Sequence, residues 1–380
     1  MRTRSKEFII VIVLLISISL IYVFTSTSNQ SNQQQTTIPR SPFTTTQLSP
    51  TSTRAHGLIN GSQPITASVY DEMLGVGINV DWLTFSRIEH YYFYWRSRGV
   101  NVAEYFKREG FSNVRIRVDG DIVSNKTYLR MLGEVVEDCL RAGLIPIIAY
   151  SANELRYKPT DPGVIKHFVE WWATAARYFK GKSYLISFDL IIETSGPITN
   201  YVYELNKIYN ETIAAIRSID KYRIIIVTAP HCSSPFYLKY LKLPKDPYII
   251  AEWHIYAKGP CPRRCNSCAC TAPEPVFDKT LISRAVEAAV NWSRETGIPL
   301  WMGAWKPNCY PKHCKETLPD GAPKPLFPPQ KALVFVKYMV TQLRQHGIPY
   351  DINADQLFFN IEKLEWYPSQ KSIIEAVLSG

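Results

Sequence analysis

Short apolar runs alternate with longer amphipathic stretches from residue 70 to the end of the chain. Most of these runs are continuous and rich in β-branched or aromatic residues, which is typical of strands covered on both faces. Glycines that close the intervening stretches, such as Gly143 and Gly297, indicate helix C-termini. The eight expected strands are residues 75–83, 113–119, 145–151, 185–194, 223–229, 248–257, 299–305 and 350–358.

Eight strand–helix units within residues 67–380 predict a (β/α)8 TIM barrel, although the fifth helix, near 235–241, is short. A doubly wound open sheet is the alternative. It usually carries a Gly-rich phosphate turn after its first strand, and no G-x-G-x-x-G motif follows residues 75–83. In a barrel of this kind, catalytic groups lie at the C-terminal ends of the strands. The polar residues at those ends are therefore the candidates for function.

The N-terminus has the pattern of a membrane anchor. Residues 8–24 are apolar apart from Ser17 and Ser19, and basic residues precede them. As a helix they are about 25 Å long, just enough to cross a bilayer core of about 30 Å. We expect residues 1–24 to be an uncleaved anchor that places the rest of the chain outside the cell. A cleaved signal peptide, and hence secretion, is the alternative, but no Ala-x-Ala site follows.

Residues 25–66 predict a disordered stalk, because they are dominated by Ser, Thr, Asn, Gln and Pro and cannot build a core. The formal net charge of the chain is +10, but its Lys and Arg are spread out. A nucleic-acid partner would require a basic cluster, so we expect none. We also expect a monomer.

Several strand ends carry polar residues. Glu193 closes an otherwise apolar strand, where desolvation tends to keep a carboxyl group protonated and suited to general-acid catalysis. On the second strand, Arg115 and Arg117 face the same side. On the sixth strand three polar residues share one face by strand parity: Glu252, His254 and Tyr256.

Five short motifs occur in the order and spacing of a known enzyme family: Gly75-Val76-Gly77-Ile78-Asn79, Val114-Arg115-Ile116, Phe188 to Glu193, His254-Ile255-Tyr256 and Gly297 to Gly303. By these motifs, residues 70–380 resemble the cellulase-type barrels of glycoside hydrolase family five. The resemblance implies hydrolysis of a β-linked polysaccharide, such as a β-1,4-glucan, without a cofactor. It implies that Glu193 is the acid/base and that Arg115, His254 and Tyr256 hold the second carboxylate and the sugar.

The sequence departs from the family pattern at three places. Ala304 stands where the family has its nucleophilic Glu, and an alanine cannot attack an anomeric carbon. The flanks of Glu193 are Ile192 and Thr194 rather than Asn and Pro, and the third strand ends in Tyr150 rather than His. Retaining hydrolysis needs two carboxyl groups about 5 Å apart, so the second one has to be found elsewhere.

Three interpretations of Ala304 remain. In the first, Glu252 supplies the second carboxylate; the reserves are Glu154, Glu362 and Glu365. In the second, water attacks directly and Glu252 or another acid is the base of an inverting mechanism. In the third, the protein is an inactive enzyme homologue that only binds carbohydrate. The structural alternative for Glu252 is a buried acid paired with Arg115 or Arg117.

Aromatic residues make up 13% of the chain, and exposed Trp side chains often stack on sugar rings. We expect Trp305 and Trp366 to stack on the substrate, with core packing as the alternative for each. Asn153, after the third strand, is a further expected substrate contact.

The eight cysteines favour disulfides over a metal site. Cys139 is expected to be buried in a helix, and Cys232 follows the fifth strand. The other six form two clusters, which an exported protein would oxidise: Cys261, Cys265, Cys268 and Cys270, and Cys309 and Cys314. A zinc site built on Cys265, Cys268 and His313 is the alternative.

Overall fold

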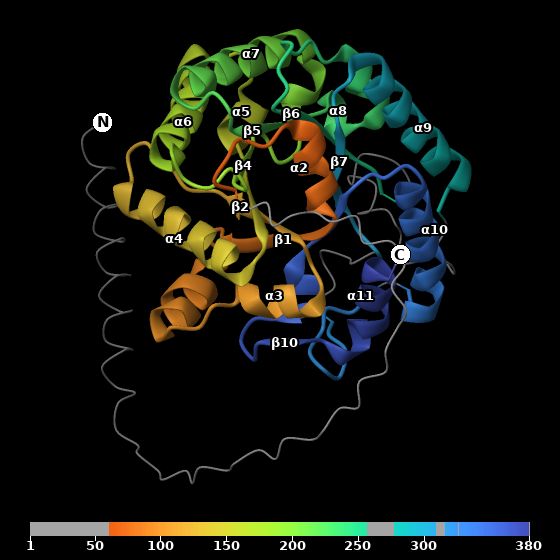
Figure 1. The fold of residues 1–380 in the computed structure, drawn as a ribbon. Helices are drawn as coiled ribbons and strands as arrows, with labels where there is room; N and C mark the ends of the chain where they lie inside the picture. Colours follow the sequence, from red (N-terminus) through yellow and green to blue (C-terminus); the bar gives the residue numbers. More distant parts are fainter. Residues whose placement is uncertain (1–60, 257–276, 309–315, 326, 380) are drawn as a thin grey trace, which may run out of the picture. The chain divides into compact units, whose positions relative to one another are not determined.

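Eight parallel strands form a closed barrel in the computed structural model, which describes residues 61–256, 277–308, 316–325 and 327–379 (Figure 1). The strands follow one another around the barrel in chain order, and β1 pairs with β8 to close it. The predicted (β/α)8 barrel is confirmed. The strands are β1 Val76–Leu83, β2 Asn113–Val118, β3 Ile145–Tyr150, β4 Ser187–Asp189, β5 Ile224–Thr228, β6 Ile249–His254, β7 Leu300–Trp305 and β8 Tyr350–Asn353.

Helices surround the barrel (Figure 1). They begin and end where the local signals indicate: Asp161 accepts hydrogen bonds from the Gly163 and Val164 amides at the start of one helix, and Gly143 closes another with φ 77°. The α-helices of the described residues are α2 Ala67–Leu74, α3 Ala103–Glu109, α4 Lys126–Ala142, α5 Asn153–Tyr157, α6 Pro162–Phe179, α7 Val202–Ile219, α8 Pro230–Ser233, α9 Lys279–Thr296, α10 Pro329–Gln345 and α11 Lys371–Leu378.

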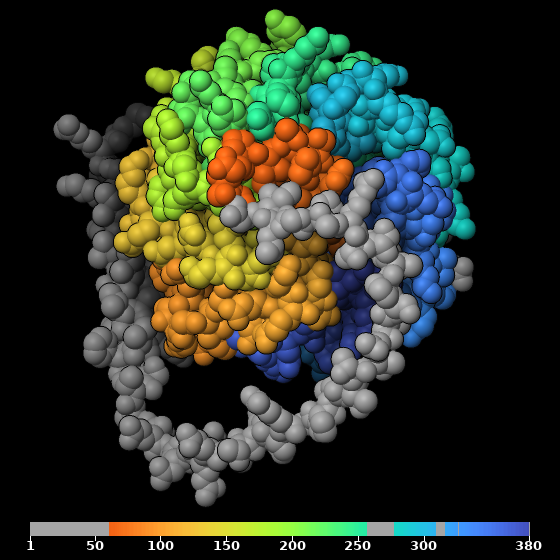
Figure 2. All heavy atoms as spheres, in the orientation of Figure 1, coloured from red at the N-terminus to blue at the C-terminus, as the bar shows by residue number. Residues whose placement is uncertain are grey.

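The α2 helix closes the barrel end at which the strands begin. Its Tyr70 is fully buried and donates a hydrogen bond of 2.8 Å to the Leu185 carbonyl, just before β4. Figure 2 shows α2, in orange, over the middle of this face. Ile65 is also buried here, and the Tyr184 amide donates to the Gly61 carbonyl. The folded domain therefore begins before residue 67, and the expected stalk, residues 25–66, is too long at its C-terminal end.

The predicted anchor, residues 1–24, and the stalk up to residue 60 lie outside the described residues. Within the part of the chain that the structure describes, no helix is both long and apolar enough to span a bilayer.

The centre of the barrel is polar on the side nearer the C-terminal strand ends. Several charged or hydrogen-bonding side chains there are fully or almost fully buried: Asn79, Arg115, Asp189, Thr228, Glu252 and His254. A glycine makes room for one of them, because a Cβ built on Gly303 would lie 1.9 Å from Glu252 Oε1. This buried layer is the floor of the site described next.

Candidate active site

A cavity of 440 Å³ opens at the C-terminal ends of the strands. Its lining includes five residues that the sequence singled out: Arg115, Glu193, His254, Tyr256 and Ala304. Residues on four different strands or the segments directly after them thus converge, which is the usual position of an active site in this fold.

Glu193 lies beyond the end of β4, on a segment that hydrogen bonds hold in place. The Ile192 amide donates to the Tyr150 carbonyl at 3.0 Å, and Arg115 Nη2 donates to the Ile192 carbonyl at 2.9 Å. The side chain of Glu193 is 17% exposed, and its Oε2 lies 3.6 Å from His254 Nδ1. The carboxylate therefore reaches the cavity from a fixed backbone.

The pKa of Glu193 is lower than usual, which corrects the expectation that desolvation keeps this group protonated. Burial alone would raise the pKa. The nearby His254 imidazolium, 3.6 Å away, together with Ser195 and Arg156, outweighs burial and lowers it. Glu193 is therefore a carboxylate near neutral pH.

His254 lies between two carboxylates. Its Nε2 is 2.6 Å from Glu252 Oε1, and its Nδ1 faces Glu193. Burial would lower the pKa of His254, but the charge and the hydrogen bond of Glu252, together with the nearby Glu193 carboxylate, raise it. The imidazole is thus stabilised in its charged form, as a bridge between the buried layer and the cavity.

Glu252 belongs to the buried layer and does not line the cavity. Its Oε1 lies 2.6 Å from Arg115 Nη2, and Thr228 Oγ1 donates to its Oε2 at 2.6 Å. Burial would raise its pKa, but Arg115 and His254 lower it. Both Glu252 and Glu193 contact one imidazole ring, so their separation is below the ~9.5 Å that inverting enzymes reach. Glu252 cannot reach a bound sugar because its carboxylate is buried below the cavity, not because it is too far from Glu193.

The expected direct role of Glu252 in catalysis therefore does not fit this arrangement. The structural alternative, a buried acid paired with Arg115, does fit. Arg115 Nε also donates to Asp189 Oδ2 at 2.7 Å. Burial raises the pKa of Asp189, Arg115 opposes this effect, and Glu252 adds to it. Arg115 thus lies between two acids of the buried layer, Asp189 and Glu252.

Ala304 lines the cavity with a methyl group, and β7 shifts register between Met302 and Trp305. No residue of the described segment 300–308 carries a carboxylate, so the end of β7 offers no nucleophile there.

The two tryptophans expected to bind sugar both pack against the core, Trp305 buried within it and Trp366 half-buried at its edge. Trp305 is fully buried, with its ring 5.7 Å from that of Phe335. Trp366 packs on Phe106 and Phe359 at 5.0 and 5.1 Å between ring centroids. Neither lines the cavity among the described residues, so the observed contacts favour core packing over the expected stacking.

Asn153 is exposed at the start of α5 and does not line the cavity. Its Oδ1 accepts a hydrogen bond of 2.5 Å from Arg156 Nη2, and Arg156 does line the cavity. Asn153 therefore orients a cavity residue rather than forming the wall. The reserve acids are also exposed and absent from the lining: Glu154, Glu362 and Glu365.

Sequence reasoning missed several cavity residues that strand parity could have found. Asp119 has the same parity as Arg115 and Arg117, and it lines the cavity. Asp81 and Asn353 line it too and flank the Arg117 guanidinium, at 3.0 and 2.7 Å.

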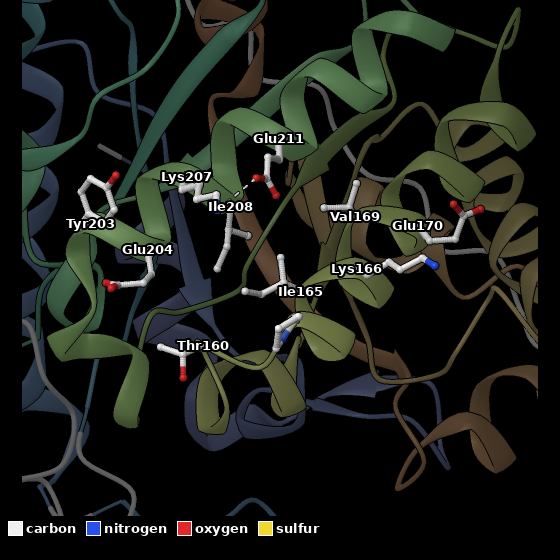
Figure 3. A pocket seen from close by; sticks show the side chains of 11 residues that line it. Thr160, Ile165, Lys166, Val169, Glu170, Tyr203, Glu204, Lys207, Ile208 and Glu211 are labelled. Atoms are coloured by element: carbon white, nitrogen blue, oxygen red, sulfur yellow. Dashed lines mark ion pairs between the residues drawn. The ribbon is translucent and has the colours of Figure 1, made fainter.

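A larger cavity, of 680 Å³, lies outside the barrel between α6 and α7 (Figure 3). Its lining combines the apolar Ile165 and Ile208 with side chains such as Lys207 and Glu211, which form a helix-surface ion pair at 3.9 Å. None of the candidate site residues lies there, so this groove is not the active-site candidate.

Cys139 is a buried free thiol, as predicted, and Cys232 is disulfide-bonded. The two predicted cysteine clusters and His313 lie outside the described residues. Within the described residues, no group of three or more His, Cys, Asp or Glu side chains is arranged to hold a metal ion.

The sequence profile of the cellulase family, glycosyl hydrolase family 5, matches residues 78–310. The chain belongs to this family. Among curated relatives, Endoglucanase H of Acetivibrio thermocellus is 27% identical over 213 residues, which are 54% of this chain and 23% of that protein. Endoglucanase C307 of Clostridium sp. (strain F1) is 26% identical over 163 residues, which are 39% of this chain and 47% of that protein. The chain thus spans less than half the length of these relatives.

Solved structures agree on the fold. The endoglucanase Cel5A from the hyperthermophilic Thermotoga maritima superposes with a TM-score of 0.65 at 18% identity, over 82% of this chain and all of that one. The tri-modular endo-β-1,4-glucanase B of Bacillus halodurans gives 0.67 at 18% identity, over 83% of this chain and 61% of that one. The barrel of this chain therefore has the architecture of these family-5 structures.

Proposed function

We propose that this family-5 protein is a glycoside hydrolase that cleaves a β-linked polysaccharide, with β-1,4-glucan as the first candidate substrate. The observation that carries the proposal is the position of Glu193. Its carboxylate enters the strand-end cavity and is supported by His254 from the buried layer below. The names of the relatives, which are endoglucanases, favour a glucan.

Glu193 has to be protonated to donate to the leaving oxygen. Because its pKa is lowered, this form is populated only at acidic pH. Activity that depends on Glu193 as an acid should decline as the pH rises through its pKa, below the usual 4.5. An acidic optimum is therefore part of the proposal.

The remaining polar residues of the cavity would bind the sugar. Tyr256 and Asn353 offer neutral hydrogen-bonding groups, and Arg156 and Lys306 offer cations. Tyr256 is the one aromatic residue of the described cavity lining, so hydrogen bonds rather than aromatic stacking dominate the described wall.

The second candidate function is carbohydrate binding without cleavage, which the methyl group of Ala304 favours. Hydrolysis of a panel of glucan, mannan and xylan between pH 3 and pH 8 separates the two candidates, with Glu193→Gln as the matched variant. The enzyme proposal expects acidic hydrolysis that Glu193→Gln abolishes while polysaccharide binding persists. Binding by both proteins without any product would establish the second candidate.

We further propose that residues 1–24 anchor the protein in a membrane, that the barrel lies outside the cell, that it acts as a monomer, and that the two cysteine clusters are oxidised. The sequence patterns described above support these proposals. We expect that extraction requires detergent and that light scattering gives the mass of a monomer. Reduction should add two mass units per disulfide bridge.

A further inference from the structure

We propose that Asn125 carries a covalent N-linked glycan and that it is the only one of the three glycosylation motifs in the described barrel to do so. The inference goes beyond the proposed hydrolysis and rests on the proposed export of the barrel, because such motifs are modified on exported chains. The sequence contains five Asn-x-Ser/Thr motifs, which begin at Asn29, Asn60, Asn125, Asn210 and Asn291. The first two begin outside the described residues, so the other three can be compared.

The amide nitrogen of Asn125 has no competing partner. Asn125 lies in the turn between β2 and α4, and both it and Thr127, the third residue of its motif, are exposed. Its Oδ1 accepts a hydrogen bond of 2.9 Å from the Tyr128 amide. Its Nδ2, the atom that would carry the sugar, makes no hydrogen bond within the part of the chain that the structure describes.

Asn210 is exposed, but both ends of its motif are engaged. Its Nδ2 donates hydrogen bonds to the Asn206 and Lys242 carbonyls, at 2.8 and 2.9 Å. Thr212 is fully buried, and its hydroxyl donates to the Ile208 carbonyl at 2.7 Å. A sugar on this nitrogen would remove at least one of the two hydrogen bonds, because the amide has only two hydrogens to donate.

Asn291 is also exposed, but its whole motif lies inside α9, Lys279–Thr296. The Ser293 hydroxyl donates a hydrogen bond of 2.6 Å to the Ile298 carbonyl. Trp292, the middle residue of the motif, is buried in the hydrophobic core. Presenting this motif to a modifying enzyme would therefore require the end of α9 to unfold and a core tryptophan to leave its packing.

Presenting the Asn125 motif requires a much smaller change. Asn125 has extended backbone angles, with φ −103° and ψ 90°, and α4 begins only at Lys126. The first turn of a helix opens at a lower cost in free energy than a packed interior segment does. An enzyme that acts on the folded chain can therefore reach this motif, whereas the other two motifs are held by buried residues.

The glycan and the start of α4 use different atoms of the Asn125 amide. Nδ2 bonds to the anomeric carbon of a lipid-linked sugar phosphate, the bond from that carbon to the phosphate oxygen breaks, and the lipid phosphate leaves with the electron pair. Nδ2 gives up one proton to solvent and keeps the other. Oδ1 is unchanged and still accepts the Tyr128 hydrogen bond. The folded barrel therefore tolerates this modification.

The first test maps glycans on the whole protein, isolated from the membranes or the medium of its source organism. Mass spectrometry of proteolytic peptides should find a sugar on Asn125 and none on Asn210 or Asn291. Unmodified Asn125 would overturn the proposal, whatever the state of the motifs that precede the barrel. A glycan on Asn210 or Asn291 would overturn it too, since accessibility in the folded chain would then not select the site.

The second test separates the motif from the helix start. Asn125→Asp keeps an oxygen that accepts the Tyr128 hydrogen bond but has no amide nitrogen, and Thr127→Val keeps Asn125 but removes the hydroxyl. Each variant should lose the mass of one whole glycan. Thr127→Ser is the matched control, because it preserves the motif and should keep the glycan. An unchanged mass increment in Asn125→Asp would overturn the assignment.

These measurements do not depend on hydrolysis. A protein that carries the glycan on Asn125 and cleaves no polysaccharide would refute the proposed function and leave this inference intact. A protein that hydrolyses polysaccharide but carries no sugar on Asn125 would do the opposite.

Discussion

Replacing Glu252 by Gln tests the role of the buried layer. The substitution keeps the shape of the side chain and removes its charge. Glu252 contacts Arg115 at 2.6 Å and His254 at 2.6 Å, and all three side chains are essentially inaccessible to solvent. The Gln amide can keep the hydrogen bond from Thr228, so the loss is mainly electrostatic.

Breaking a buried ion pair by removing one partner usually costs about 3–5 kcal/mol, because the other charge stays buried. Here Asp189 lies beside the same guanidinium, so Arg115 keeps one acidic partner when Glu252 is replaced. We therefore expect the lower end, a loss of about 3 kcal/mol in the free energy of unfolding. Urea unfolding at pH 7 measures this loss. Exposed Glu154→Gln is the control and should stay within about 0.5 kcal/mol of wild type.

The same variant should shift the pH dependence of hydrolysis. Without Glu252, the pKa of His254 falls and its imidazole loses charge, so the pKa of Glu193 rises. The alkaline limb of the pH–rate profile should then move to higher pH, because Glu193 stays protonated up to a higher pH. Unchanged stability together with complete loss of activity at every pH would refute the reasoning and place Glu252 among the reacting groups.

Three further predictions concern other parts of the site. Gly303→Ala should lower stability by more than about 2 kcal/mol in urea unfolding, because its Cβ would occupy the position of the Glu252 carboxylate; a neutral effect would show that Glu252 moves freely. Arg156→Gln should raise the pKa of Glu193, since Arg156 helps to lower it, and so shift the alkaline limb of kcat/KM to higher pH; a shift to lower pH would contradict this. Trp305→Ala should lower stability by about 3–5 kcal/mol and leave the Kd for oligosaccharide unchanged, whereas weaker binding at unchanged stability would restore its expected stacking role.

The barrel was predictable because its strands are buried on both faces and therefore appear as continuous apolar runs. The exact ends of the strands were less predictable. The apolar run at residues 185–194 predicted a long strand, yet β4 ends at Asp189. The segment from Leu190 to Ile192 is held by separate backbone and side-chain hydrogen bonds, including those to Tyr150 and Arg115, rather than by a regular ladder, and periodicity contains no information about such contacts.

Strand parity predicts the direction of a side chain but not its depth in the barrel. It correctly placed Glu252 on the same face as His254, yet only the structure shows that Gly303 lets its carboxylate settle beneath the cavity. For Trp305, the register shift in β7 interrupts the simple alternation on which such reasoning depends. Parity with Arg115 and Arg117 could also have pointed to Asp119, but no family motif drew attention to it.

The position of Glu252 determines what a carboxylate at position 304 would meet. The Arg115 guanidinium already contacts Asp189 and Glu252, and its Nη1 lies 3.3 Å from the Gly303 carbonyl, next to position 304. A glutamate introduced at position 304 would therefore meet an arginine that already has two acidic partners, beside another anion. We expect the effects of Ala304→Glu and Glu252→Gln on stability to be non-additive, because both changes act on one guanidinium.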